Sequence, residues 1–170
     1  MAMKTETRRL ALGAVLAAAE TALIYLSGVV PSGRLALAVL AGLLNALAVL
    51  EAGRRTAWLT FAATGALSLL LCPLKGPPLC YLVLFGHYPI VKSLLERIRS
   101  RWLCLAAKLG VYVLAAAALL ALYSRALLSG VALPAWSLYL LAAAGGAAFL
   151  VYDLVMSGLI QTYLNRKMKL

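Results

Sequence analysis

Long apolar runs separated by short polar connections make up most of the chain. The runs lie at about residues 10–30, 35–50, 57–71, 79–91, 102–123 and 135–163. A helix needs ~20 mostly apolar residues to cross the ~30 Å hydrocarbon core of a bilayer. The second, third and fourth runs are shorter, so we expect them to draw on flanking polar residues or to pack inside a helical bundle. Six crossings are predicted, with four or five as the alternative.

Composition places these runs in a bilayer rather than in the core of a soluble domain. The chain is 65% hydrophobic and only 12% charged, which excludes a soluble domain of 170 residues. Backbone groups in hydrocarbon must be paired within the protein, so a span is either a helix or a strand of a closed barrel. The alternation at every second residue that marks barrel strands is weak here. The sequence therefore predicts an all-α, polytopic membrane protein, a six-transmembrane-helix bundle that forms a single domain over residues 1–170.

The net charge of +11 is carried mainly by the connections between the apolar runs. Apart from Lys108, which lies just inside a span, twelve Lys and Arg residues fall on the side of the two termini, and only Arg34, Lys75 and Arg125 fall on the other side. The positive-inside rule then places both termini in the cytoplasm, the N-in/C-in orientation of a multi-pass protein of the bacterial cell membrane. This distribution favours the bilayer over nucleic acid as a partner.

A basic segment follows the fourth apolar run. It carries Lys92, Arg97, Arg99 and Arg101 beside an apolar face. Such a segment is expected to lie in the cytoplasmic interface and to attract anionic lipid headgroups or a cytoplasmic partner. Orienting the protein in the membrane is the simpler role.

A carboxylic acid, Glu20, lies deep in the first run, where an ionisable group is costly and marks a candidate site. At 100° per residue it shares one helix face with Gly13, Ala17 and Ser27, and this face is expected to point into the bundle. Asn45, at a similar depth in the second run, is the expected hydrogen-bond partner. Two interpretations stay open: a neutral Glu20 bonded to Asn45 for structural reasons, or a functional acid.

The nearly opposite face of the first run is made of alanines: Ala11, Ala14, Ala18 and Ala22. Small side chains let helix backbones approach closely, so this face suits contact with another helix. The contact is either with a partner protein or within the bundle.

A second polar stripe runs through the last apolar run. It consists of Tyr139, Gly146, Asp153, Ser157 and Gln161, whose spacings of 7, 7, 4 and 4 keep them on one side of a helix. One interpretation pairs Asp153 with Lys108 of the fifth run. The other has the stripe line a water-accessible cavity or a solute site.

The segment from Phe85 to Pro89 predicts a kink, because Pro89 lacks a backbone donor and its ring clashes with the carbonyl of Phe85. His87 lies in this segment and is expected to bond a neighbour, with a proton relay as the alternative.

Cys72 and Cys80 flank a proline-rich connection, and whether they pair is left open. Three cysteines and one histidine do not have the spacing of a metal site, so no metal or other cofactor is expected. The sequence lacks the motifs of zinc proteases, serine hydrolases and phosphate-binding loops. We therefore expect no enzyme.

Near the last outer connection, Tyr123, Trp136 and Tyr139 are expected either to line an outer pocket or to form the interfacial aromatic belt.

Several of these features resemble the substrate-binding S components of energy-coupling factor (ECF) importers. The shared features are the size, the six-helix N-in layout, the Ala14-x-x-x-Ala18 face and the Pro31-Ser32-Gly33 segment before a second run rich in small residues. The segment from Gly86 to Ile90 is also similar to one in uncharacterised small bacterial membrane proteins. The ECF resemblance implies that Ala14 and Ala18 contact a transmembrane coupling subunit, which works with ATPases.

The resemblance also implies that a small solute binds near the outer side. We expect Tyr81, Tyr123, Trp136 and Tyr139 to line this outer pocket. A non-transport scaffold that recruits partners through the first helix and the basic cytoplasmic face is the alternative, and a small proton-coupled transporter that uses Glu20, His87 and Asp153 is a third hypothesis.

Overall fold

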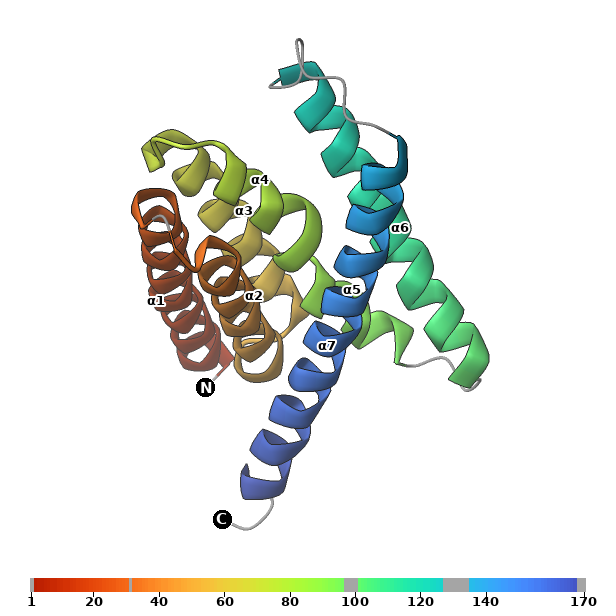
Figure 1. Ribbon diagram of the computed structural model, residues 1–170. Helices are drawn as coiled ribbons and strands as arrows, with labels where there is room; N and C mark the ends of the chain where they lie inside the picture. The colour runs from red at the N-terminus through yellow and green to blue at the C-terminus, as the bar shows by residue number, and fades with distance from the viewer. Residues whose placement is uncertain (1, 31, 97–100, 127–134, 168–170) are drawn as a thin grey trace. The chain divides into compact units, whose positions relative to one another are not determined.

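The computed structural model describes residues 2–30, 32–96, 101–126 and 135–167, without the side chains at 2–5, 101, 120, 122–126, 135–144, 164 and 167. The elements in chain order (Figure 1) are α1 (Ala2–Val29), α2 (Arg34–Glu51), α3 (Arg54–Leu71), α4 (Gly76–Cys80), the π-helix η1 (Tyr81–Phe85), α5 (Tyr88–Leu95), α6 (Arg101–Ala126) and α7 (Ala135–Lys167). These ranges contain helices and no strand, which confirms the all-α prediction. Each predicted apolar run falls on helix, and the fourth is divided among α4, η1 and α5.

Five stretches of the described residues are long and apolar enough to cross a membrane, as in a multi-pass membrane protein. They are Glu6–Val29, Arg34–Glu51, Gly76–Leu95, Trp102–Leu119 and Gly145–Tyr163. The third predicted span, α3, is not among them. Two arginines at its start and a row of hydroxyl side chains along one face lower its mean hydropathy.

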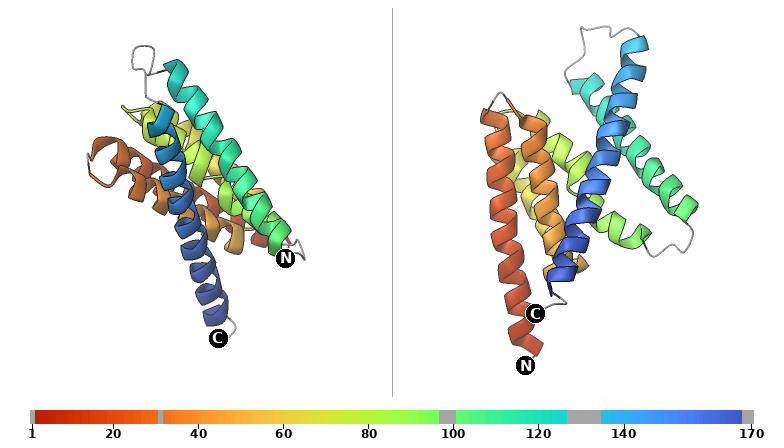
Figure 2. Two further views of the ribbon diagram at one scale, coloured as in Figure 1. Left: turned by 45° about the vertical axis from the view of Figure 1, so that its right-hand side comes forward. Right: turned by 60° about the horizontal axis from the view of Figure 1, so that its bottom comes forward.

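The chain forms two compact units, residues 1–111 and residues 112–170, and the boundary falls inside α6. In unit 1, α1 contacts both α2 and α3, and α2 contacts η1 and α5. Figure 2 shows α1 and α2 side by side and antiparallel. In unit 2, the rings of Tyr112 on α6 and Phe149 on α7 pack with their centroids 4.9 Å apart. A single domain over residues 1–170 stays a prediction.

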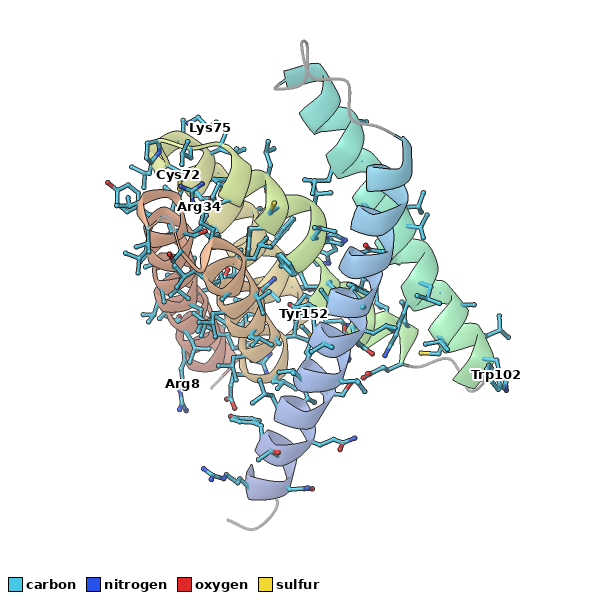
Figure 3. The ribbon with its side chains drawn as sticks, in the orientation of Figure 1. Arg8, Arg34, Cys72, Lys75, Trp102 and Tyr152 are labelled. Atoms are coloured by element: carbon cyan, nitrogen blue, oxygen red, sulfur yellow. The ribbon has the colours of Figure 1, made fainter. Side chains whose placement is uncertain are left out.

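Short connections hold the first three helices of unit 1 together. Ser27 Oγ on α1 donates a hydrogen bond to the carbonyl oxygen of Arg34 at the start of α2, at 2.8 Å. Only Ala52 and Gly53 join α2 to α3, and Gly53 has a φ of 88°, a left-handed conformation that favours glycine. Arg34 and Lys75, both predicted on the outer side, lie at one end of unit 1, and Arg8 lies at the other end (Figure 3).

The predicted kink in the fourth run is confirmed. Residues 81–85 form a π-helix, and Gly86 and His87 form a bend before α5 begins. The backbone N–H of Gly86 donates to the carbonyl of Tyr81 at 2.7 Å, and that of Ile90 donates to the carbonyl of His87 at 3.1 Å. Ile90 thus bonds three residues back instead of four, and this shift leaves the carbonyl of Gly86 without its usual helical donor.

His87 bonds a neighbour, as predicted. Its Nδ1 lies 3.2 Å from the carbonyl oxygen of Leu82. Because a carbonyl only accepts, Nδ1 must carry the proton in this contact. The His87 ring also contacts the ring of Phe61 at a centroid distance of 6.3 Å, so the histidine packs the bend against α3.

A lysine in the connection after α3 bonds backbone carbonyls at the C-terminal end of that helix. Lys75 Nζ donates to the carbonyl oxygens of Leu69 at 2.7 Å and Cys72 at 3.0 Å. A cation near a helix C-terminus is favourable, because the last carbonyls are unpaired and carry partial negative charge. Cys72 itself is buried, and neither it nor Cys80 forms a disulfide.

We expect the thiol of Cys72 to react slowly with maleimide. Burial raises its pKa above the ordinary value, against an opposing effect of the nearby Lys75 charge. A raised pKa leaves less of the reactive thiolate at neutral pH, and the reaction rate should increase as the pH rises toward that pKa. Labelling followed by mass spectrometry should modify the half-buried Cys104 well before Cys72, and all three cysteines should react after denaturation. Equal rates for Cys72 in folded and denatured protein would contradict its burial.

Candidate functional site at the α1–α3 seam

A row of hydroxyl side chains lines the face of α3 that packs against α1. Thr56, Thr60, Thr64 and Ser68 recur every four residues, and all four are buried. Thr60 Oγ1 lies 3.4 Å from the carbonyl oxygen of Gly13, and Thr64 Oγ1 lies 3.4 Å from that of Ala17. Hydroxyl groups on small residues are common where membrane helices approach closely, because they bond backbone carbonyls without adding bulk.

Gly13 sets the distance between the two helices. A Cβ built on Gly13 would lie 2.6 Å from Thr56 Cγ2 and 3.2 Å from Thr60 Oγ1, closer than real contacts allow. The buried face of α1 continues from Gly13 through Ala17 to Glu20. The prediction that the acid face of the first helix points into the bundle is therefore confirmed.

Glu20 is fully buried at the end of this seam. Its Oε2 accepts hydrogen bonds from Thr64 Oγ1 at 2.9 Å and from the Tyr81 hydroxyl at 2.7 Å. Its other oxygen, Oε1, has no hydrogen-bond partner among the described residues. A buried polar atom without a partner costs about 1–3 kcal/mol, and more if it is charged. One carboxyl oxygen therefore accepts two hydrogen bonds, and the other accepts none.

Asn45 is fully buried too, but the prediction that it bonds Glu20 is wrong. Its Nδ2 donates to the carbonyl oxygen of Gly86 at 2.6 Å. The kink explains this choice, because it removes the helical donor from that carbonyl, and an unpaired carbonyl in an apolar bundle is costly. Asn45 Oδ1 is left without a partner among the described residues.

Glu20 and Asn45 nevertheless lie in the same layer of unit 1. One apolar cluster includes Ile24 of α1 and Ala41 of α2. In a second cluster, Leu16 of α1 packs with Ala48 of α2. Because the two helices are antiparallel, residue 20 and residue 45 both fall between these clusters. We call Glu20, Asn45, Thr64, Tyr81 and Gly86 the polar junction.

The alanine face of α1 is exposed. Ala14 and Ala18 both lie on the surface of unit 1, together with Ala11 and Ala22. A shallow groove of about 190 Å³ lies beside them, between α1 and α3. Its lining residues are Leu10, Gly13, Ala14, Ala17, Thr56, Leu59, Thr60 and Ala63. The face predicted to contact a partner is therefore open, while the contact itself stays a prediction.

Tyr81 does not lie in an open outer pocket, contrary to our expectation. Its side chain is fully buried, and its hydroxyl is bonded to Glu20. At the start of η1 the side chain points toward α1 and α3, where its ring meets that of Phe61 at a centroid distance of 5.9 Å. The other expected pocket residues, Tyr123, Trp136 and Tyr139, lie outside the described side chains.

The structure gives Lys108 a partner that the sequence did not suggest. Its Nζ lies 3.7 Å from Glu96 Oε1. Lys92 Nζ lies 3.6 Å from the same oxygen, so Glu96 joins the end of α5 to α6 within unit 1. Glu96 is 46% exposed, and such ion pairs contribute little stability. Whether Asp153 pairs with Lys108 stays a prediction.

Lys92 is 1% exposed, so this lysine does not present its side chain to lipid headgroups, while the interfacial placement of the basic segment stays a prediction. Lys92 lies one turn after the buried Tyr88 on α5, and its aliphatic stem is buried while its charge reaches Glu96. Arg97 and Arg99 lie outside the described residues, and the side chain of Arg101 does as well.

The polar stripe of α7 is only partly enclosed within the described side chains. Gly146, Asp153 and Ser157 are half-buried, and Gln161 is exposed. Ser157 Oγ donates to the backbone carbonyl of Asp153 at 2.8 Å. The stripe is present as a helical face, and its role as a cavity lining stays a prediction. Among the described residues, no three His, Cys, Asp or Glu side chains come together as metal ligands.

Sequence reasoning missed Thr64, Tyr81 and Glu96 as partners. Thr64 could have been found, because Thr56, Thr60, Thr64 and Ser68 are spaced by one helical turn each and would form a hydroxyl face in any helix. Tyr81 carried no such signal, since its direction depends on the π-helix.

Comparison of the chain with protein-family models, with curated proteins and with solved structures found no match.

Proposed function

We propose that this chain is a membrane-embedded subunit that docks onto a transmembrane partner through α1 and captures a small solute, as an S component of an ECF importer does. The proposal rests on how α1 is oriented about its own axis. Its polar face is bonded inside unit 1, and its alanine face, with Ala14 and Ala18, is on the surface.

The exposed alanines suit a helix–helix contact in a bilayer. Association there depends on close packing, since lipid tails are as apolar as leucine side chains and give little hydrophobic gain. Ala14 also borders the groove between α1 and α3, which would receive side chains of a partner helix. The coupling subunit expected from the resemblance, working with its ATPases, is the partner we propose.

The proposed orientation is six crossings with both termini in the cytoplasm. The excess of Lys and Arg on the side of the termini supports it. Arg34 and Lys75, the two outer cations of unit 1, lie at the same end of that unit, as this orientation requires (Figure 3). In this arrangement α3 crosses as a helix that is protected by α1 and α2.

A non-transport scaffold is the second candidate, and one observation favours it. Tyr81, one of four residues expected to bind solute, is fully buried and bonded to Glu20. A scaffold would use the same alanine face with a different partner and would not need an outer pocket.

Affinity purification of the tagged chain from its native membrane distinguishes the candidates. We expect wild-type protein to recover a coupling subunit with ATPases, and Ala18→Leu to recover about tenfold less, because a bulky side chain separates the helices. Ala19→Leu is the matched control, since Ala19 is also exposed but faces about 100° away on the helix. Its recovery should equal that of the wild type.

Other outcomes identify the alternative or reject the docking face. Recovery of membrane proteins without an ATPase, together with no bound small molecule by mass spectrometry, would favour the scaffold. Equal recovery with Ala18→Leu and Ala19→Leu would reject α1 as the docking helix.

A further inference from the structure

The polar junction contains two oxygen atoms that need a positively charged or hydrogen-donating ligand. Glu20 Oε1 and Asn45 Oδ1 are both acceptors, both belong to fully buried side chains, and neither has a partner among the described residues. Two buried acceptors cannot satisfy each other, because neither carries a proton to donate unless the carboxyl group binds one. A bound cation would satisfy both.

The hydrogen bonds that are present leave one oxygen of each side chain unpaired. Thr64 and Tyr81 both donate to Glu20 Oε2, so that oxygen is already satisfied. Asn45 is held by its Nδ2, which donates to the carbonyl of Gly86. The amide is therefore fixed with its oxygen available, and the carboxyl group is fixed with Oε1 available.

Within the described part of the chain, no positively charged side chain bonds either of these two oxygens. On the elements packed against α1 or α2, the titratable side chains of the described residues are Arg34 and Glu51 on α2, Arg54 and Arg55 on α3, Cys80 on α4, Tyr81 on η1, and Tyr88 and Lys92 on α5. Of these, Tyr81 donates a hydrogen bond to Glu20. The charged residues of α2 and α3 lie at helix ends, at least six residues from Asn45 or Thr64, which is roughly 9 Å or more along the helix. Lys92 is buried, and its charge lies beside Glu96.

We propose that Glu20 and Asn45 form one exchangeable site for a monovalent cation, a proton or Na⁺, held at Glu20 Oε1 and Asn45 Oδ1. A proton bound to Oε1 makes that oxygen a hydrogen-bond donor, so the bond to the Asn45 carbonyl, which the structure lacks, would form only in the protonated state. A sodium ion uses the same two oxygens as ligands, with the hard oxygen donors that such ions prefer. The inference stands independently of the proposed docking function.

The location suits exchange. The site lies beside a π-helix and a bend, where four segments meet: α1, α2, α3 and the kinked segment from α4 to α5. π-helical turns inside helices are frequent at functional sites. The row of hydroxyl groups on α3 leads from the junction toward the end of the helix where α3 begins.

Reaction with dicyclohexylcarbodiimide, which modifies protonated buried carboxyl groups, tests the proposal on the full chain in detergent. Modification of Glu20, read by mass spectrometry of its peptide, should fall as the pH rises. In a second arm at fixed pH and ionic strength, Na⁺ replaces choline. Protection by Na⁺ identifies sodium as an occupant, and a pH effect without Na⁺ protection identifies the proton alone.

Asn45→Ala should change the H⁺ or Na⁺ concentration at which Glu20 modification is half-maximal by about tenfold, as expected for the loss of one hydrogen bond to a charged group. Glu20→Gln should abolish modification at that position and serves as the blank. The proposal is overturned if Glu20 in wild-type protein does not react at any pH, or if its reaction is insensitive to both pH and Na⁺. An unchanged midpoint in a folded Asn45→Ala protein would overturn the shared site.

Discussion

Replacing Gly86 by alanine is expected to destabilise the protein by about 2–4 kcal/mol, through overpacking and a broken hydrogen bond. The added Cβ would lie 2.7 Å from both Phe61 Cδ2 and Tyr81 Cζ. Neither ring can move away easily. Phe61 also packs against Trp58, at a centroid distance of 5.7 Å, and the Tyr81 hydroxyl is bonded to Glu20.

The matched control is Gly110→Ala, a glycine in α6 where an added Cβ meets nothing within 4 Å. Alanine is a better helix former than glycine, so this variant should be neutral or stabilised by up to about 1 kcal/mol. Unfolding in mixed micelles with increasing sodium dodecyl sulfate, followed by circular dichroism, measures both variants. Equal stability of Gly86→Ala and Gly110→Ala would show that the bend does not bring these rings together.

Replacing Tyr81 by alanine is expected to cost about 3–5 kcal/mol, as for other large aromatic side chains removed from a core. The side chain is fully buried, so its removal leaves a cavity and takes a donor from Glu20. In a bilayer the loss comes from packing and from the unpaired carboxyl group more than from hydrophobic transfer. Tyr81→Phe keeps the ring and should cost about 1–3 kcal/mol, the effect of the hydroxyl alone.

Tyr25 provides the control on α1, because 46% of its side chain is exposed. Tyr25→Phe should change stability by less than about 0.5 kcal/mol. Combining Tyr81→Phe with Glu20→Met should cost less than the sum of the two single changes, because either change alone removes the hydrogen bond between these side chains. A Tyr81→Phe protein as stable as Tyr25→Phe would contradict the bond to Glu20.

The sequence predicted the positions of the helices and the rotation of α1 well, because both follow from local pattern. Apolar length fixes where a helix can run, and the spacing of Gly13, Ala17 and Glu20 fixes which face is polar. The kink was predictable for a similar reason, since Pro89 removes a donor whatever surrounds it.

The partners within the junction depended on tertiary geometry that no local pattern carries. Similar depth suggested that Asn45 would bond Glu20, but the bend had freed the carbonyl of Gly86, and the amide satisfies that group instead. Tyr81, at the start of η1, points inward, away from the outer pocket expected of it. Lys92 was assigned to the interface from its charge, although the packing around α5 buries its side chain.

The most direct test of the central claim is a nitroxide scan of α1 from residue 14 to residue 24, on purified protein in lipid nanodiscs and a background without native cysteines. The structure predicts high collision rates with oxygen at Ala14, Ala18 and Ala22, and low rates with an immobile label at Ala17 and Ile24. Maxima at Ala17 and Ile24, with Ala14 and Ala18 shielded, would contradict the account.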